Sequence, residues 1–259
     1  MSSGKALGYV LVAPDWLARY RAGQRDLVWH ELRQLGKAVR EPGLIEEAQL
    51  VCDEMARRAR HNVDVLVGRL NDAGYRFHWG GDERNSTTPH DAPSAAAGEH
   101  AEWLEERFGP VPLALLSWVR IVGDVWLVGT HPDWPGSMAA DPLVIGAEVA
   151  DSPGFIREDF ADWHEAWKDE MAKNPETGPF ILPLAPDRFH KYGRSGGGHY
   201  GVIVPDAGAE GIFVAETAMP FVSYLNWVFF NGGFPYPGRY SDDGGRRIKE
   251  SLAKGLLSL

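Results

Sequence analysis

The hydrophobic positions of the N-terminal third recur at three- and four-residue steps, the spacing of a helix with one buried face. The strongest run covers residues 46–73, and Gly74 follows it as a C-terminal cap. Its apolar positions are Ala48, Val51, Cys52, Met55, Ala59, Val63, Leu66, Leu70 and Ala73. A second run covers residues 14–38. The pattern predicts that this third of the chain is helical.

Downstream of residue 98, helical patterns mix with short strand-like runs. Helices are predicted at 99–109, 110–123, 154–174, 219–233 and 246–257. Runs of β-branched and apolar residues between turn residues predict strands at 124–130, 179–184, 199–204 and 211–216. Because three of these strands follow one another without helices between them, we predict an α+β fold with a mostly antiparallel sheet packed with helices.

The stretch at 80–98 separates these two patterns. It is rich in Gly, Ser, Thr, Pro and Ala, a composition typical of flexible connections. It predicts a flexible linker between a helical N-terminal region, 1–79, and an α+β domain, 99–259.

Charge adds an asymmetry to this division. The chain has 259 residues and a net charge of −10. Residues 1–78 carry 12 basic and 10 acidic groups, whereas residues 79–259 carry 14 and 26. Such acidity repels phosphate backbones, so direct nucleic-acid binding is not expected. It favours a basic protein partner. The alternative is that the acidic residues only keep the protein soluble, which gives the same composition.

Cysteine content and hydropathy bear on the compartment. The one cysteine, Cys52, excludes an internal disulfide and falls on the apolar face of a predicted helix, so we expect a buried thiol. No apolar run approaches the about 20 residues of a membrane span, and the start of the chain has no convincing signal peptide. These features favour the cytoplasm and no membrane partner.

The motif "GRSGGG" at 193–198 matches the G-x-S-x-G nucleophile elbow of serine hydrolases, with Ser195 as the nucleophile. An elbow requires a helix after the serine, but the next segment predicts a strand. No histidine follows His199, which is too close to serve as the base. We therefore interpret the motif as a hairpin turn between two strands, in which glycines supply positive φ angles.

Acidic residues concentrate on the predicted helix at 154–174. Residues 99–176 carry 16 acids and 5 bases. The helix places aromatic residues on one face, and its acids form a candidate partner-binding surface: Glu158, Asp159, Asp162, Glu165, Asp169 and Glu170. "HEAWK" at 164–168 lacks the second histidine of H-E-x-x-H, so no metal site is expected.

A second candidate site is a pocket between two loops. "GTHPDWPG" at 129–136 places His131, Asp133 and Trp134 after a predicted strand, where functional loops often lie. The glycine-rich turn adds Ser195 and His199. The commoner meaning of such a loop is a turn held by an Asp side chain.

The order of elements resembles the SMI1/KNR4 superfamily, also called SUKH, over about residues 99–230. The segments that carry the resemblance are "LEERFGPVPLALLSWVRIVG", "LPLAPD", "GGGHYGVIVPD", "GIFVAET" and "PFVSYLNWVF". The resemblance implies a binding role, as an immunity protein that covers a toxin, often a nuclease, or as a regulatory interaction module. It implies no catalytic residue and no cofactor. The whole chain also resembles actinobacterial proteins of the same length, which implies no function.

Two hypotheses follow from the sequence. The first is a cytoplasmic protein-binding module that uses acidic and aromatic surface against a basic partner, such as a toxin. The second is an enzyme or small-molecule binder with a pocket near 129–136 and the 193–199 turn. The missing catalytic constellation favours the first, and neither hypothesis calls for a cofactor or a metal.

Overall fold

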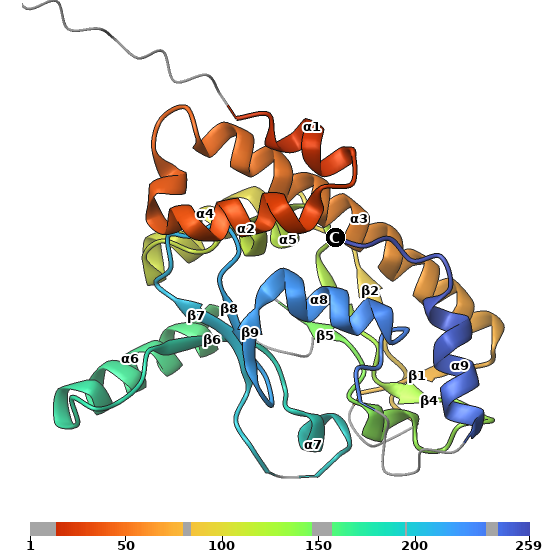
Figure 1. The fold of residues 1–259 in the computed structure, drawn as a ribbon. Coiled ribbons are helices and arrows are strands. Elements are labelled where there is room, and N and C mark those ends of the chain that lie inside the picture. Colours follow the sequence, from red (N-terminus) through yellow and green to blue (C-terminus); the bar gives the residue numbers. More distant parts are fainter. Residues whose placement is uncertain (1–13, 80–83, 147–156, 195, 237–242) are drawn as a thin grey trace, which may run out of the picture.

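The computed structural model describes residues 14–79, 84–146, 157–194, 196–236 and 243–259. It confirms the α+β class, since a helical N-terminal region is followed by antiparallel sheets and further helices (Figure 1). The helices within residues 16–40 lie at one end of the molecule in this view, the long helix at 45–72 extends from them toward the last helix, and the sheets lie below.

The helix predicted at 14–38 is three shorter ones. These are α1 (Trp16–Arg21), α2 (Arg25–Leu35) and the 3-10 helix η1 (Gly36–Arg40). Gly23 has φ +98° and Gly36 has φ +51°, backbone conformations that other residues rarely adopt. The stretch predicted to be helical is helical, and the chain turns at both glycines, which divides it into three.

The helix predicted at 46–73 is confirmed as α3 (Ile45–Asp72). Gly74 follows with φ +74°, as expected of a residue that ends a helix. Cys52 is fully buried, as predicted. Helix α3 packs against α1, α5 (Leu113–Ile121) and α9 (Asp243–Ala253), so it runs through the centre of the molecule.

Residues 84–98, expected to belong to a flexible linker, contain regular structure. They include β2 (His90–Asp91), which pairs with β3 (Asp124–Trp126), and the start of α4 (Ala97–Phe108). The N-terminal helices and the later elements contribute side chains to one hydrophobic core. The division into 1–79 and 99–259 stays a prediction, and the shared core argues against two independent folding units.

Two small antiparallel sheets lie beside α3. In one, β1 (Arg76–Phe77) pairs with β4 (Gly129–Thr130); in the other, β3 lies between β2 and β5 (Val144–Ile145). The strand predicted at 124–130 is thus divided between two sheets. Gly129 is required where they meet, because a Cβ there would collide with the carbonyl oxygen of Arg76.

The four-stranded sheet confirms the antiparallel prediction. Its order is β6-β7-β8-β9, and the strands are β6 (Phe180–Ala185), β7 (Tyr200–Val204), β8 (Ile212–Val214) and β9 (Ala218–Pro220). Helix α8 (Phe221–Phe230) follows β9 directly and packs on this sheet.

The buried carboxylate of Glu210 joins this sheet region to the N-terminal helices. Its Oε1 accepts hydrogen bonds from the amides of Val222 and Ser223, at 3.0 and 3.2 Å, in the first turn of α8. Its Oε2 lies 2.5 Å from the guanidinium of Arg33 on α2. One side chain thus caps α8 and connects it to α2.

The connection between β6 and β7 is longer than the hairpin turn that the sequence predicted. It contains α7 (Arg188–Lys191), preceded by Asp187, whose Oδ1 accepts the amides of Phe189 and His190 at 2.7 and 2.9 Å. Gly197 lies so close to Asp187 that a Cβ would collide with the carboxylate. The glycines do supply positive φ, +72° at Gly193 and +43° at Gly197. The capping Asp, which is local, is the signal that the prediction missed.

The last residues run as an extended segment along α3 and α8. The side-chain amide of Asn62 on α3 donates to the carbonyl of Leu257 and accepts its N–H, at 2.8 and 2.7 Å. Asn226 on α8 makes the same pair of bonds with Leu259, at 3.3 and 2.8 Å. In an extended chain, residues two apart face the same way. Leu257 and Leu259 can therefore each bond to one of the two asparagines.

Candidate functional site

Helix α6 (Arg157–Lys173) carries the predicted acidic surface and projects from the body of the protein (Figure 1). One side of this helix is attached to the body of the protein. The ring of His164 lies 5.0 Å from that of Phe108 on α4 and 4.8 Å from that of Phe180 on β6. The indole N–H of Trp167 donates to the carbonyl of Gly178 at 2.9 Å. The aromatic face of α6 therefore packs against the body of the protein, as its pattern predicted. We call this attached side the root of the helix.

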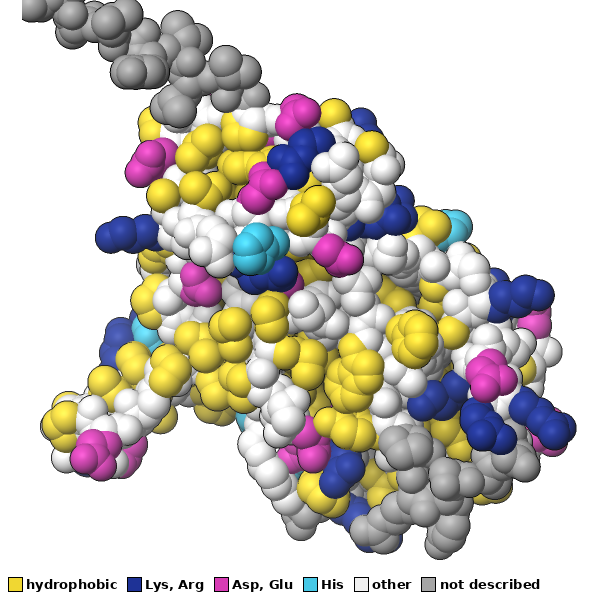
Figure 2. Space-filling view, viewed as in Figure 1, with side chains coloured by type: hydrophobic (Ala, Val, Ile, Leu, Met, Phe, Trp, Pro, Cys, Tyr) yellow, Lys and Arg dark blue, Asp and Glu magenta, His cyan; other side chains and the backbone are white. Residues whose placement is uncertain are grey.

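The acidic side chains are turned away from this root. Asp162, Glu165, Asp169 and Glu170 are exposed, and Asp159 is half-buried. Figure 2 shows acidic side chains gathered at the far end of the projecting helix. The side chain of Glu158 lies outside the described residues. Most of the predicted surface is thus accessible to a partner.

Glu165 is an acid of α6 with two cationic neighbours. Its Oε1 lies 2.6 Å from the guanidinium of Arg107 on α4 and 3.2 Å from the ammonium of Lys168. The hydrogen bond from Arg107 holds the pKa of Glu165 below its usual value. Glu165 therefore helps to attach α6, and Asp162, Asp169 and Glu170 are the better candidates for partner contact.

The loop at 129–136 is packed into the core. His131 and Trp134 are buried, and only Asp133 of the three predicted residues is exposed. The amide of Asp133 donates to Nδ1 of His131 at 3.0 Å, and the ring of Trp134 lies 5.2 Å from that of Phe234. Burial lowers the pKa of His131. The loop forms a turn, the commoner of the two meanings considered, although a His ring and not the Asp side chain accepts this bond.

The glycine-rich segment contributes different contacts. Ser195 lies outside the described residues, and the chain enters β7 at Tyr200, so a strand and not a helix follows it. His199 lies with its ring 5.0 Å from that of Trp163 on α6, and burial lowers its pKa. The amide of Trp134 donates to the carbonyl of His131 within the loop, whereas the ring contact of His199 is with α6. A shared pocket at these residues stays a prediction.

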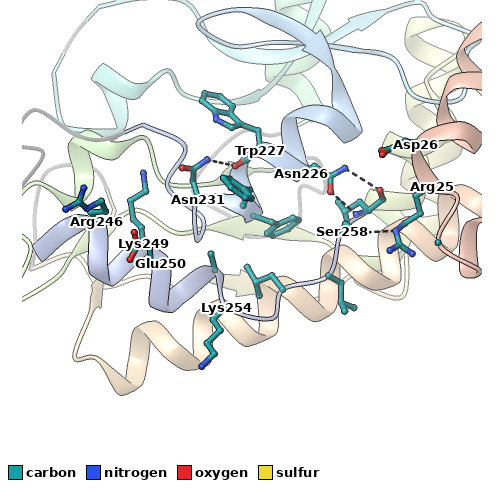
Figure 3. Close-up of a pocket in the computed structure, with 17 residues that line it drawn as sticks. Arg25, Asp26, Asn226, Trp227, Asn231, Arg246, Lys249, Glu250, Lys254 and Ser258 are labelled. Atoms are coloured by element: carbon teal, nitrogen blue, oxygen red, sulfur yellow. Dashed lines mark hydrogen bonds between the residues drawn. The ribbon is translucent and has the colours of Figure 1, made fainter. Parts of the chain in front are cut away.

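A cavity that the sequence analysis missed lies between α8, α9 and the C-terminal segment. Its volume is about 1190 Å³. Figure 3 shows the residues that line it. Trp227, Phe229 and Phe230 of α8 line it, as do Arg246, Lys249 and Glu250 of α9. The sequence predicted both helices but not that these two faces are opposed, since they are separated along the chain.

A buried ion pair was also missed. Nζ of Lys191 on α7 lies 2.7 Å from Oδ1 of Asp141, and both side chains are fully buried. Asp141 has φ +57°, which is uncommon outside glycine. The same ammonium lies 5.0 Å from the centre of the Tyr200 ring. This pair fixes α7 against the segment that precedes β5, and nothing local in "FHKY" marks Lys191 as buried.

Metal and membrane features can be assessed only over the described part of the chain. There, no group of three or more His, Cys, Asp or Glu side chains is placed to hold a metal ion. None of the helices in that part combines the length and the apolar composition of a membrane span. Comparisons of the chain with protein-family models, curated proteins and solved structures returned no match.

Proposed function

We propose that this chain is a protein-binding module of the SMI1/KNR4 type that engages a basic protein through helix α6. A toxin that the chain neutralises, or a protein that it regulates, would fit this description. The observation that carries the proposal is the projection of α6 from the body with Asp162, Asp169 and Glu170 exposed on it.

Physical chemistry supports a partner at this surface. Like charges on one helix repel each other, and a basic partner would relieve that repulsion. Asp169 and Glu170 have no recorded ion pair among the described residues, whereas Glu165 has two. Exposed charges act mainly on the association rate, which makes the proposal accessible to kinetic tests. We place the interaction in the cytoplasm, where a single buried cysteine and no disulfide are ordinary.

The partner can be captured at α6 itself. A photo-crosslinking residue at Asp169, introduced in the cells that make the protein, should join the chain to a basic protein. The same residue at the exposed Asp72, at the end of α3, should not. The absence of a basic protein at Asp169, or its capture equally at Asp72, would contradict the proposal.

Kinetics with the captured protein then test the charges. Asp162, Asp169 and Glu170 changed to Lys should slow association at least about tenfold at low salt. The difference should shrink as salt rises and the Debye length falls to about 10 Å at 0.1 M. The matched control changes Glu41, Glu46 and Asp72 to Lys, which alters net charge equally at other exposed positions. If both variants slow association equally, net charge and not α6 is responsible.

A further inference from the structure

The cavity between α8 and α9 differs in sign from the rest of the protein. Its lining includes Arg25, Arg246, Lys249 and Lys254 against Asp26 and Glu250, so cations exceed acids there. The whole chain has a net charge of −10. Figure 2 shows Lys and Arg side chains over α9 beside apolar side chains over α8. This local excess of cations beside an apolar surface favours an anionic ligand, although the net charge of the protein is negative.

The apolar part of the cavity comes mainly from α8. Phe230 is 82% exposed, the largest exposed fraction among the exposed large hydrophobic side chains described. Trp227 is half-buried, and its ring lies 5.2 Å from that of Tyr236, which holds it in place. Burying such rings under a ligand is favourable, at about 25 cal/mol for each Å² removed from water. Ligand sites combine an apolar lining of this kind with a few placed polar groups.

Lys249 supplies the polar group. Its Nζ donates to the carbonyl of Tyr236 at 3.1 Å, and the side chain is half-buried. No ion pair with a carboxylate is recorded for it among the described residues. Figure 3 shows Lys249 extending from α9 toward Trp227 on α8 and Asn231 just after it, whereas Lys254 extends away. Burial lowers the pKa of Lys249, and a bound anion would oppose that effect.

The C-terminal segment forms a fixed wall of the same cavity. Leu256 and Leu257 line it, and the paired amide bonds of Asn62 and Asn226 hold the segment in place. A wall that is held before the ligand arrives lowers the entropy lost on binding. We propose that this cavity binds an anionic amphiphile, whose alkyl chain lies on Trp227, Phe230 and Leu256 and whose head group meets Lys249.

Decanoate is the probe for this proposal, with its binding to the full chain measured by titration calorimetry. It should bind at one site, and decyltrimethylammonium, which has the same chain and the opposite charge, should not. Lys249→Met should weaken decanoate binding at least about tenfold by removing the charge at similar length. Phe230→Asp should abolish it by placing a carboxylate on the apolar part of the lining.

Two matched variants control for general effects. Arg247→Glu changes an exposed cation on the same helix that does not line the cavity, and Leu27→Asp changes a leucine that is 58% exposed and likewise outside the lining. Both should leave the affinity within about twofold. Phe230 is so exposed that Phe230→Asp should fold even if Lys249→Met does not. No binding of decanoate, equal binding of the cationic probe, or unchanged affinity in Phe230→Asp would overturn the proposal.

Discussion

Helices α3 and α6 are both long, amphipathic and rich in charge, but they have different surroundings. Helix α3 contacts α1, α5 and α9, whereas α6 is attached along one side to α4 and β6. The contrast shows that amphipathic pattern and charge do not decide whether a helix is a central support or a projecting arm. The number of helices and strands that pack against it decides this.

The charged side chains show the same contrast. Arg60 on α3 donates to the carbonyl of Ile121, the last residue of α5, at 3.1 Å. Arg69 donates to the carbonyl of Leu252 near the end of α9 at 2.6 Å, and Arg58 to that of Ser258 at 2.8 Å. Cations are favourable at the C-terminal ends of helices, where carbonyl groups lack partners. On α6, by contrast, Asp162, Asp169 and Glu170 are exposed.

Three arginines lie close together on α3: Arg57, Arg58 and Arg60. Such a cluster on a helix predicts a solvated, charged face. Only Arg57 is exposed, and the other two are half-buried and hydrogen-bonded to the carbonyls of distant segments. Long side chains can pack their stems while their charged ends reach such carbonyls.

The largest expected effect is the difference in unfolding free energy between apolar positions on the two helices. Leu66→Ala in α3, at a fully buried position, should lower the free energy of unfolding by about 3 kcal/mol. Met171→Ala in α6, at a half-buried position, should lower it by less than about 1 kcal/mol. Denaturant unfolding at equilibrium measures both. Equal losses would mean that α6 is as embedded as α3, and the comparison would fail.

A smaller effect is expected from the ion pairs that tie each region to the body. Glu210→Ala should cost about 2 kcal/mol, because it leaves two amides of α8 without their acceptor and Arg33 without its partner. Glu165→Ala, which removes the exposed pair with Arg107, should cost clearly less, because water screens that pair. Thermal unfolding monitored by circular dichroism would compare them. A loss at Glu165 that matches the loss at Glu210 would show that α6 is held by charge and not by its aromatic root.

The smallest expected effect is the pH dependence at the root of α6. Burial lowers the pKa of His164 from its ordinary 6.5, and Lys168 and Arg107 lower it further. The unfolded chain therefore takes up this proton more readily than the folded protein. The stability is complete above about pH 6.5 and falls below it, by at most about 1.4 kcal/mol per pH unit for this one group.

Unfolding measured between about pH 7.5 and about pH 5.5 should show this loss, and His164→Gln should flatten the slope. The variant should keep part of the slope, because burial also lowers the pKa values of His131 and His199. A slope that is the same in His164→Gln would mean that this ring is not held neutral at the root.

Much of the local structure was predictable, because it depends on neighbours in the chain. The helices at 46–73 and 154–174, and three strands of the four-stranded sheet, were located within a few residues of α3, α6, β6, β7 and β8, whereas β9 was missed and partly assigned to the following helix. Misses came where a local signal was overlooked, as with Gly23 and Gly36 within the first helix and Asp187 before α7. The candidate sites divide in the same way. The acidic face of α6 follows from periodicity, but the attachment of Glu165 to Arg107 does not.

The sequence by itself determined the periodic elements, the acidic excess and the absence of a recognisable catalytic motif, since each of these follows from residue types and their spacing. Only the tertiary structure decided that Lys191 is buried against Asp141, that Asn62 and Asn226 hold residues 257 and 259, and that α8 and α9 face each other across a cavity. The physical reason is that these contacts join segments that are not neighbours in the chain: the side-chain bonds span 33 to 195 residues, and the loop between α8 and α9 decides how those two helices face each other. Residue spacing along the chain carries no record of such pairings.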